Sequence, residues 1–258
     1  MSRSVKLALD LLMGAVLPIV VLNTLTAPLG APLAYVIAAL IPVGWVLLDL
    51  LAITRQFNAI TAVAGLTALG NGALAFWFVD GVLFALKDTV GLLLYAALLA
   101  GSIAIGKPFL GPLFAQAVGA TTPEQRHALD PVLCEPPVRR ALSRGTLAVV
   151  AATLLAAAAN IWLNIQIVTA AFGTEAFNQQ VAQVNAITRL AFPIVTVGAL
   201  GLAVLATYRA VFACLPALPD GQAWHEADIW ELLRQRSITS ASEDGTDTRR
   251  RRPHQQMD

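Results

Sequence analysis

Six long apolar stretches alternate with polar links along the chain, and this pattern predicts the fold class. The hydrocarbon core of a bilayer is about 30 Å thick, so a helix that crosses it needs roughly 20 apolar residues. We therefore predict an all-α, polytopic membrane helix bundle with six transmembrane helices. The predicted spans are Leu7–Leu25, Leu33–Ile53, Ala59–Val79, Thr89–Ile105, Gly145–Ala171 and Ile187–Cys214.

The polar segments divide the chain into two predicted parts. Residues 1–215 form the transmembrane domain, which includes a long cytoplasmic connection at 107–144. Residues 216–258 form a cytoplasmic tail. Its first part, Trp224–Arg236, mixes apolar and charged residues and favours a short amphipathic helix on the membrane surface. The remainder, Ser237–Asp258, is polar, lacks aromatic residues and is typical of disorder.

The distribution of basic residues predicts the orientation in the membrane. Lysine and arginine concentrate at the N-terminus, near Arg55, in the 107–144 connection and in the tail, whereas the opposite links hold Lys87. Arg189, at the outer start of the sixth stretch, is the main exception. Cytoplasmic loops carry an excess of Lys and Arg. We therefore expect a bacterial inner-membrane protein with both termini in the cytoplasm.

Composition agrees with a bilayer environment. Of the 258 residues, 57% are hydrophobic and 13% are charged, whereas soluble domains carry about 25% charged residues. The first apolar stretch follows Arg3 and Lys6, but no small-residue cleavage site stands out after it, so we expect a retained span. The expected partners are the lipid bilayer and other inner-membrane envelope or division proteins, and no nucleic acid.

The sequence shows no motif typical of catalysis, metal binding or cofactor binding. Cys134 and Cys214 are the only cysteines, and neither belongs to a CxxC or Cys/His pattern. The three histidines lie far apart, and we find no glycine-rich phosphate loop, nucleophile elbow or pair of catalytic carboxylates. We expect no enzymatic activity, no cofactor and no metal. A membrane-embedded enzyme would need a cluster of acids, histidines or ligands at the membrane face.

Asn160 and Asn164 are amides one helical turn apart in the fifth apolar stretch. An unpaired amide in hydrocarbon costs several kcal/mol, so both side chains should face protein or water. They either form hydrogen bonds between helices or line a polar cavity. Small residues at four-residue spacing form smooth stripes that let helices approach closely, in the fifth stretch and the third: Ala152 and Ala156, and Ala64, Ala68 and Gly72. We expect contacts between helices of one chain, with a homodimer face as the alternative.

Lys87, Asp88 and Lys107 flank the fourth apolar stretch. Lys87 and Asp88 precede it on the outer side, where we expect Lys87 to anchor the helix at the interface and Asp88 to cap its first turn. Lys107, followed by Pro108, marks its cytoplasmic end, where a positive charge complements the helix dipole. These three residues and the two asparagines are the candidate functional or packing residues.

Four segments resemble, in order and spacing, parts of the intracellular septation protein A family. Phe78–Thr89 contains a lysine and a threonine like those at a helix start in that family, and Ser102–Pro108 resembles its Gly/Lys/Pro helix exit. Ala157–Asn160 is similar to its asparagine-bearing fifth helix. Phe172–Asn178 is similar to the outer loop that follows. The similarity covers about Leu7–Arg209.

The chain departs from that family in several places. The family often has tryptophan where this chain has Leu86 and proline where it has Asp88, and here the 107–144 connection is longer and the tail is extra. We therefore expect a distant relative. The resemblance implies an inner-membrane protein linked to envelope maintenance and cell division, without established catalytic residues.

Two functional hypotheses follow. The first is a non-enzymatic inner-membrane protein, septation-protein-like, that acts in envelope maintenance or division through helix packing and partner contacts. The alternative is a small-molecule transporter or permease with a polar cavity near Asn160 and Asn164, whose two sets of three spans form an inverted repeat. Two observations speak against the alternative. The two sets of three spans show no sequence similarity to each other, and few polar groups lie within the spans. A proton relay also needs more than one intramembrane ionisable group.

Overall fold

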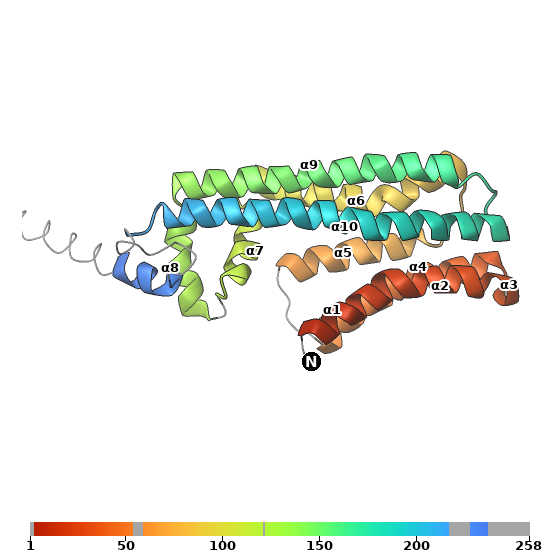
Figure 1. Ribbon diagram of the computed structural model, residues 1–258, viewed down its shortest axis with the longest axis horizontal. Coiled ribbons are helices and arrows are strands. Elements are labelled where there is room, and N and C mark those ends of the chain that lie inside the picture. Colours follow the sequence, from red (N-terminus) through yellow and green to blue (C-terminus); the bar gives the residue numbers. More distant parts are fainter. Residues whose placement is uncertain (1–2, 54–58, 121, 217–227, 237–258) are drawn as a thin grey trace, which may run out of the picture. The chain divides into compact units, whose positions relative to one another are not determined.

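The computed structural model describes residues 3–53, 59–120, 122–216 and 228–236, and their regular structure is helical, without strands (Figure 1). The predicted all-helical fold is therefore confirmed over the described residues. Four helical segments are long and apolar enough to cross a membrane: Ala31–Ile53, Gly81–Ala104, Pro136–Ile167 and Glu175–Phe212. These helices correspond to the second, fourth, fifth and sixth predicted spans and are compatible with a membrane protein.

The first and third predicted spans form shorter helices. The first consists of α1 (Arg3–Leu11), the π-helical turn η1 (Leu12–Val16) and α2 (Leu17–Thr24), followed by the short α3 (Thr26–Leu29). Its apolar part runs over Ala8–Thr24. The third is α5 (Ala59–Leu74), with 16 residues. The four long helices thus support a membrane protein, whereas the six crossings stay a prediction.

The chain divides into two compact units. The first comprises residues 1–109 and 146–202, and the second comprises 110–145 and 203–258. This division by contacts differs from the predicted boundary at residue 215, which stays a prediction about membrane placement. The helices α9 (Pro136–Ile167) and α10 (Glu175–Phe212) contribute to both units.

Close helix approach in the first unit depends on small residues. Helix α5 packs against α4 (Ala31–Leu48), which continues into the π-helical turn η2 (Asp49–Ile53), and against α6 (Gly81–Ala104). A Cβ on Gly72 would lie 3.2 Å from both methyl groups of Val43 in α4. The Gly72 end of the predicted stripe therefore contacts a helix of the same chain, whereas the side chains of Ala64 and Ala68 lie outside the described residues.

Helix α6 begins at Gly81, whose φ of 57° suits glycine, and not at Thr89 as predicted from hydropathy. Asp80 is its N-cap residue, and the Asp80 carboxylate accepts a hydrogen bond from the Phe172 N–H at 3.2 Å instead of capping the helix. Lys87 and Asp88 consequently lie inside the helix. The prediction that Asp88 caps its first turn is wrong, because the first turn lies further toward the N-terminus.

The second unit contains α7 (Leu110–Ala117), α8 (Pro123–Leu133) and the adjoining ends of α9 and α10. Thr122 and Gln125 form a capping box at the start of α8, with bonds of 3.1 and 3.2 Å. A Cβ on Gly145 would lie 2.6 Å from Leu110 and 2.9 Å from Ala203, so glycine permits the close approach of these segments.

The predicted amphipathic helix is present over residues 229–236. Its apolar side chains are buried within the second unit: Ile229, Leu232 and Leu233. The Arg236 guanidinium connects this helix to the rest of the unit, because it donates hydrogen bonds to the Glu135 carboxylate at 2.5 Å and to the Cys214 carbonyl at 3.0 Å. The expectation that this face lies on lipid is therefore wrong, since protein covers it. The predicted disordered segment 237–258 lies outside the described residues.

Candidate functional site

A polar cluster lies within the first unit, where α6 and α9 run side by side (Figure 1). Asn160 and Asn164 of α9 both donate from Nδ2 to the same Asp88 oxygen, Oδ2, at 3.0 and 3.1 Å. Asn160 also donates to the Thr89 hydroxyl at 3.0 Å, and Asn164 donates to the Asn160 carbonyl at 2.9 Å. An amide nitrogen has two hydrogens, so both asparagines use their full donor capacity on protein.

Burial differs sharply across this network. Asn160 is 4% exposed, Asn164 is 1% exposed and Thr89 is fully buried. Asp88 itself is exposed, so the carboxylate forms the outer edge of a buried polar layer. The Asn164 Oδ1 atom is buried without a hydrogen-bond partner among the described residues. The cluster therefore has spare acceptor capacity at Asn164.

Two cations lie near the same carboxylate. The Asp88 charge interacts electrostatically with the Lys87 ammonium on α6 and with the Arg189 guanidinium on α10. Asp88 is thus coupled electrostatically to one lysine and one arginine of apolar helices in the same unit. Ionisable groups within membrane helices are rare, usually pair with one another and mark functional sites.

Lys87 is buried, with 4% of its surface exposed. Its Nζ atom donates to the Trp77 carbonyl at 2.5 Å and lies 4.8 Å from the centre of the Tyr35 ring and 5.8 Å from that of Phe84. A carbonyl dipole and two aromatic faces therefore compensate the lost hydration of the ammonium. The prediction that Lys87 anchors the helix at the interface is wrong, because an anchoring lysine keeps its charged end in water.

Arg189 connects α10 to the N-terminal helices. Its Nη1 atom donates to the Gly14 carbonyl, and its Nε atom donates to the Asn185 side chain at 3.3 Å. Gly14 precedes Pro18 by four residues, and proline has no N–H to give to that carbonyl. Arg189 supplies the donor that Pro18 lacks, which explains how the helix accommodates a proline at this position.

A third amide side chain, that of Asn178, lies in the first turn of α10 and is fully buried. Its Nδ2 atom donates to the Thr26 hydroxyl at 2.8 Å and to the Ala31 carbonyl at 2.9 Å. Its Oδ1 atom has no partner among the described residues. This asparagine joins α10 to Thr26 of α3 and to Ala31, the first residue of α4.

Lys107 does not belong to the cluster. It follows the opposite end of α6, where its side chain is exposed and its backbone N–H donates to the Ser102 carbonyl at 3.0 Å. The structure thus brings together four of the five candidate residues: Lys87, Asp88, Asn160 and Asn164. Among the described residues, no group of three or more His, Cys, Asp or Glu side chains could hold a metal ion.

Sequence reasoning missed Thr89, Tyr35, Asn178 and Arg189 as members or neighbours of this site. Arg189 could have been found from the sequence, because it is the main exception to the concentration of lysine and arginine on the predicted cytoplasmic side. An arginine on the wrong side of that asymmetry indicates a specific partner inside the protein. Thr89 and Asn178 each end a segment that the resemblance singles out, whereas Tyr35 looks like an ordinary helix residue in the sequence.

Comparison with known proteins adds no assignment to this geometry. No family model, curated protein or solved structure matches the chain.

Proposed function

We propose that the chain is a non-enzymatic inner-membrane protein, distantly similar to the septation protein A family, that acts in envelope maintenance or division. Four of its six proposed crossings are the long apolar helices, and Ala8–Thr24 and α5 supply the other two. A 16-residue helix is about 24 Å long, so α5 would cross where the bilayer thins or its flanking residues complete the span. Both termini then lie in the cytoplasm.

The observation that carries this proposal is the convergence of the residues behind the resemblance. Lys87 and Thr89 come from one of the similar segments, Asn160 from another and Phe172–Asn178 from a third. In the fold, the Thr89 hydroxyl accepts a hydrogen bond from the Asn160 amide at 3.0 Å. The aromatic side chains of the same segments also meet, with ring centres 5.0 Å apart for Phe78–Phe172 and for Phe84–Phe177.

Such convergence favours a role in which these segments act together. The network fixes α9 against α6, and the Phe84–Phe177 contact fixes α10 against α6. Hydrogen bonds between membrane helices contribute about 0.6 kcal/mol each on average and up to about 1.7. The exposed edge of Asp88 cannot face lipid at low cost. A partner helix or water in a crevice must cover it, which fits a protein that works through contacts with others.

The test is complementation of cells that lack the protein. We expect altered division or envelope integrity, restored by the wild-type chain and not by Asp88→Asn at equal membrane abundance. Lys107→Gln, outside the cluster, is the matched control and should restore the phenotype. Normal cell length, septum placement and detergent resistance in the deleted strain would refute the proposed role.

A specific observation favours a second candidate, a transporter or proton-coupled permease. The sequence suggested too few intramembrane ionisable groups, but Asp88 interacts electrostatically with both Lys87 and Arg189. The Asn164 Oδ1 atom, which has no partner among the described residues, could accept a hydrogen bond from a solute. Proteoliposomes that enclose a pH-sensitive dye would test it. Proton flux that Asp88→Asn abolishes, with the protein still folded, would favour this candidate over the first.

A further inference from the structure

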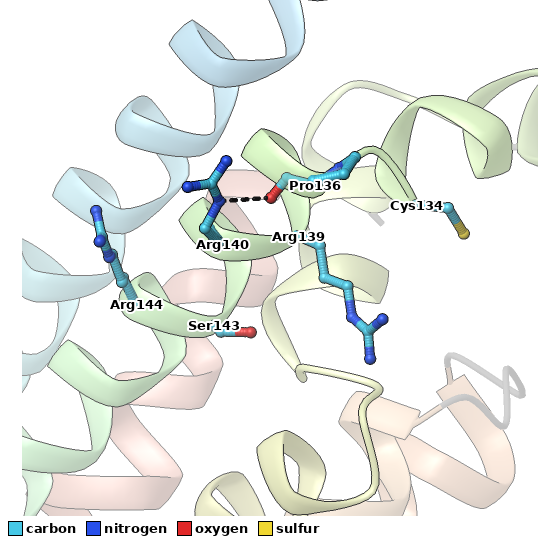
Figure 2. Close-up of a pocket in the computed structure, with 6 residues that line it drawn as sticks. All are labelled: Cys134, Pro136, Arg139, Arg140, Ser143 and Arg144. Carbon is cyan, nitrogen blue, oxygen red and sulfur yellow. Dashed lines mark hydrogen bonds between the residues drawn. The ribbon is translucent and has the colours of Figure 1, made fainter.

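We propose that a basic recess at the start of α9 binds the phosphate headgroup of an anionic phospholipid. The recess has a volume of about 410 Å³ and lies wholly within the second unit (Figure 2). It is lined by Cys134, Pro136, Arg139, Arg140, Ser143 and Arg144. The inference rests on the proposed membrane placement of α9.

The charge of the recess calls for an anion. Its three arginines lie within six consecutive residues of one helix and are all exposed. Glu135, the acidic residue adjacent to this segment, is already engaged by Arg236 at 2.5 Å. The Arg140 Nε atom donates to the Pro136 carbonyl at 3.1 Å, which orients the rest of the guanidinium outward, away from Pro136 (Figure 2). Arg140 and Arg144 are like charges one helical turn apart, an arrangement that is destabilising and that a bound anion would relieve.

The chemistry of the lining side chains fits phosphate. Guanidinium groups form paired, charge-assisted hydrogen bonds with phosphate oxygens, and arginine is favoured wherever such recognition is needed. Arg140 and Arg144 are one turn apart and share a face of α9, so one phosphate group can lie between them. The Ser143 hydroxyl adds a neutral donor to the same recess.

The position of the recess along α9 distinguishes a lipid from a soluble anion. Arg144 directly precedes the apolar part of the helix, from Gly145 to Ile167, which is about 35 Å long at 1.5 Å per residue. That length matches a hydrocarbon core of about 30 Å, with headgroups extending roughly 5–8 Å further on each side. Arg139–Arg144 therefore lie at headgroup depth.

Native mass spectrometry of the full-length chain, purified in detergent with phosphatidylglycerol or phosphatidylcholine, tests the inference. We expect at least a several-fold preference for retained phosphatidylglycerol. Arg140→Gln with Arg144→Gln should remove the preference. Arg234→Gln should keep it, because Arg234 is an exposed arginine of the same unit that pairs with Glu231 at 3.1 Å.

Cys134 provides a second readout, because it lines the recess and its thiol is exposed. In a Cys214→Ser background, a neutral maleimide should label Cys134 several-fold more slowly in phosphatidylglycerol vesicles than in phosphatidylcholine vesicles, and the double arginine variant should lose this protection. Equal protection by inorganic phosphate would overturn the assignment to lipid. Equal labelling in both kinds of vesicle would overturn the site while leaving the membrane placement intact. Failure to insert into either would overturn the membrane placement and, with it, this inference.

Discussion

The hydrogen bonds between Asp88 and the two asparagines of α9 make a quantitative prediction. Asp88→Ala removes the oxygen that accepts from Asn160 at 3.0 Å and from Asn164 at 3.1 Å. Two interhelical bonds at about 0.6 to 1.7 kcal/mol each give a loss of about 1–3 kcal/mol in the free energy of unfolding. Because Asp88 is exposed, we expect a value toward the lower end.

A double-mutant cycle isolates this interaction. The free energy of unfolding is measured in mixed micelles for wild type, Asp88→Ala, Asn160→Ala and the double variant. Residues that share a hydrogen bond show coupling of about 0.5–3 kcal/mol, whereas distant sites add independently. We therefore expect at least about 0.5 kcal/mol of coupling between Asp88 and Asn160.

Asn178 provides the matched control for the cycle. It is a buried amide in the same unit, but its hydrogen bonds go to Thr26 and Ala31. Coupling of Asp88→Ala with Asn178→Ala should therefore be close to zero. Coupling of Asp88 to Asn160 no larger than that to Asn178 would show that α6 and α9 do not meet in the described register.

Further predictions concern the two cations and the two thiols. Lys87→Gln removes the hydrogen bond between the ammonium and the Trp77 carbonyl, so it should lower the free energy of unfolding by about 1–3 kcal/mol. Membrane insertion should be unchanged. Lost insertion at unchanged stability would instead indicate that Lys87 anchors the helix at the interface. Arg189→Leu should destabilise the protein, and Pro18→Ala should recover part of the loss by restoring an N–H, whereas additive losses in the double variant would exclude this pairing. Burial and the nearby Glu135 raise the pKa of the Cys214 thiol. Cys214 should therefore hold less thiolate at neutral pH than an ordinary cysteine, and iodoacetamide should alkylate it more slowly than the exposed Cys134, with a rate that keeps rising at alkaline pH. Equal rates for the two thiols across that range would contradict the prediction.

The hydropathy pattern was sufficient to predict an all-helical chain with membrane-length apolar helices, because helix formation in an apolar segment depends on local composition. The cost of an unpaired amide was sufficient to single out Asn160 and Asn164, and both are indeed buried. Local rules failed at Lys87 and Asp88. These rules predicted that both charged residues precede the helix, because a charge inside an apolar helix is costly unless a partner compensates it.

The partners that compensate those charges lie far away in the sequence, and only the tertiary structure brings them together. Asp88 meets amides 72 and 76 residues further along the chain. The Gly14 carbonyl, four residues before Pro18, finds its donor in Arg189, 175 residues away. Periodicity and composition describe neighbours within a few turns of one helix. Which helices approach one another, and therefore which polar groups can be buried together, depends on packing across the whole unit.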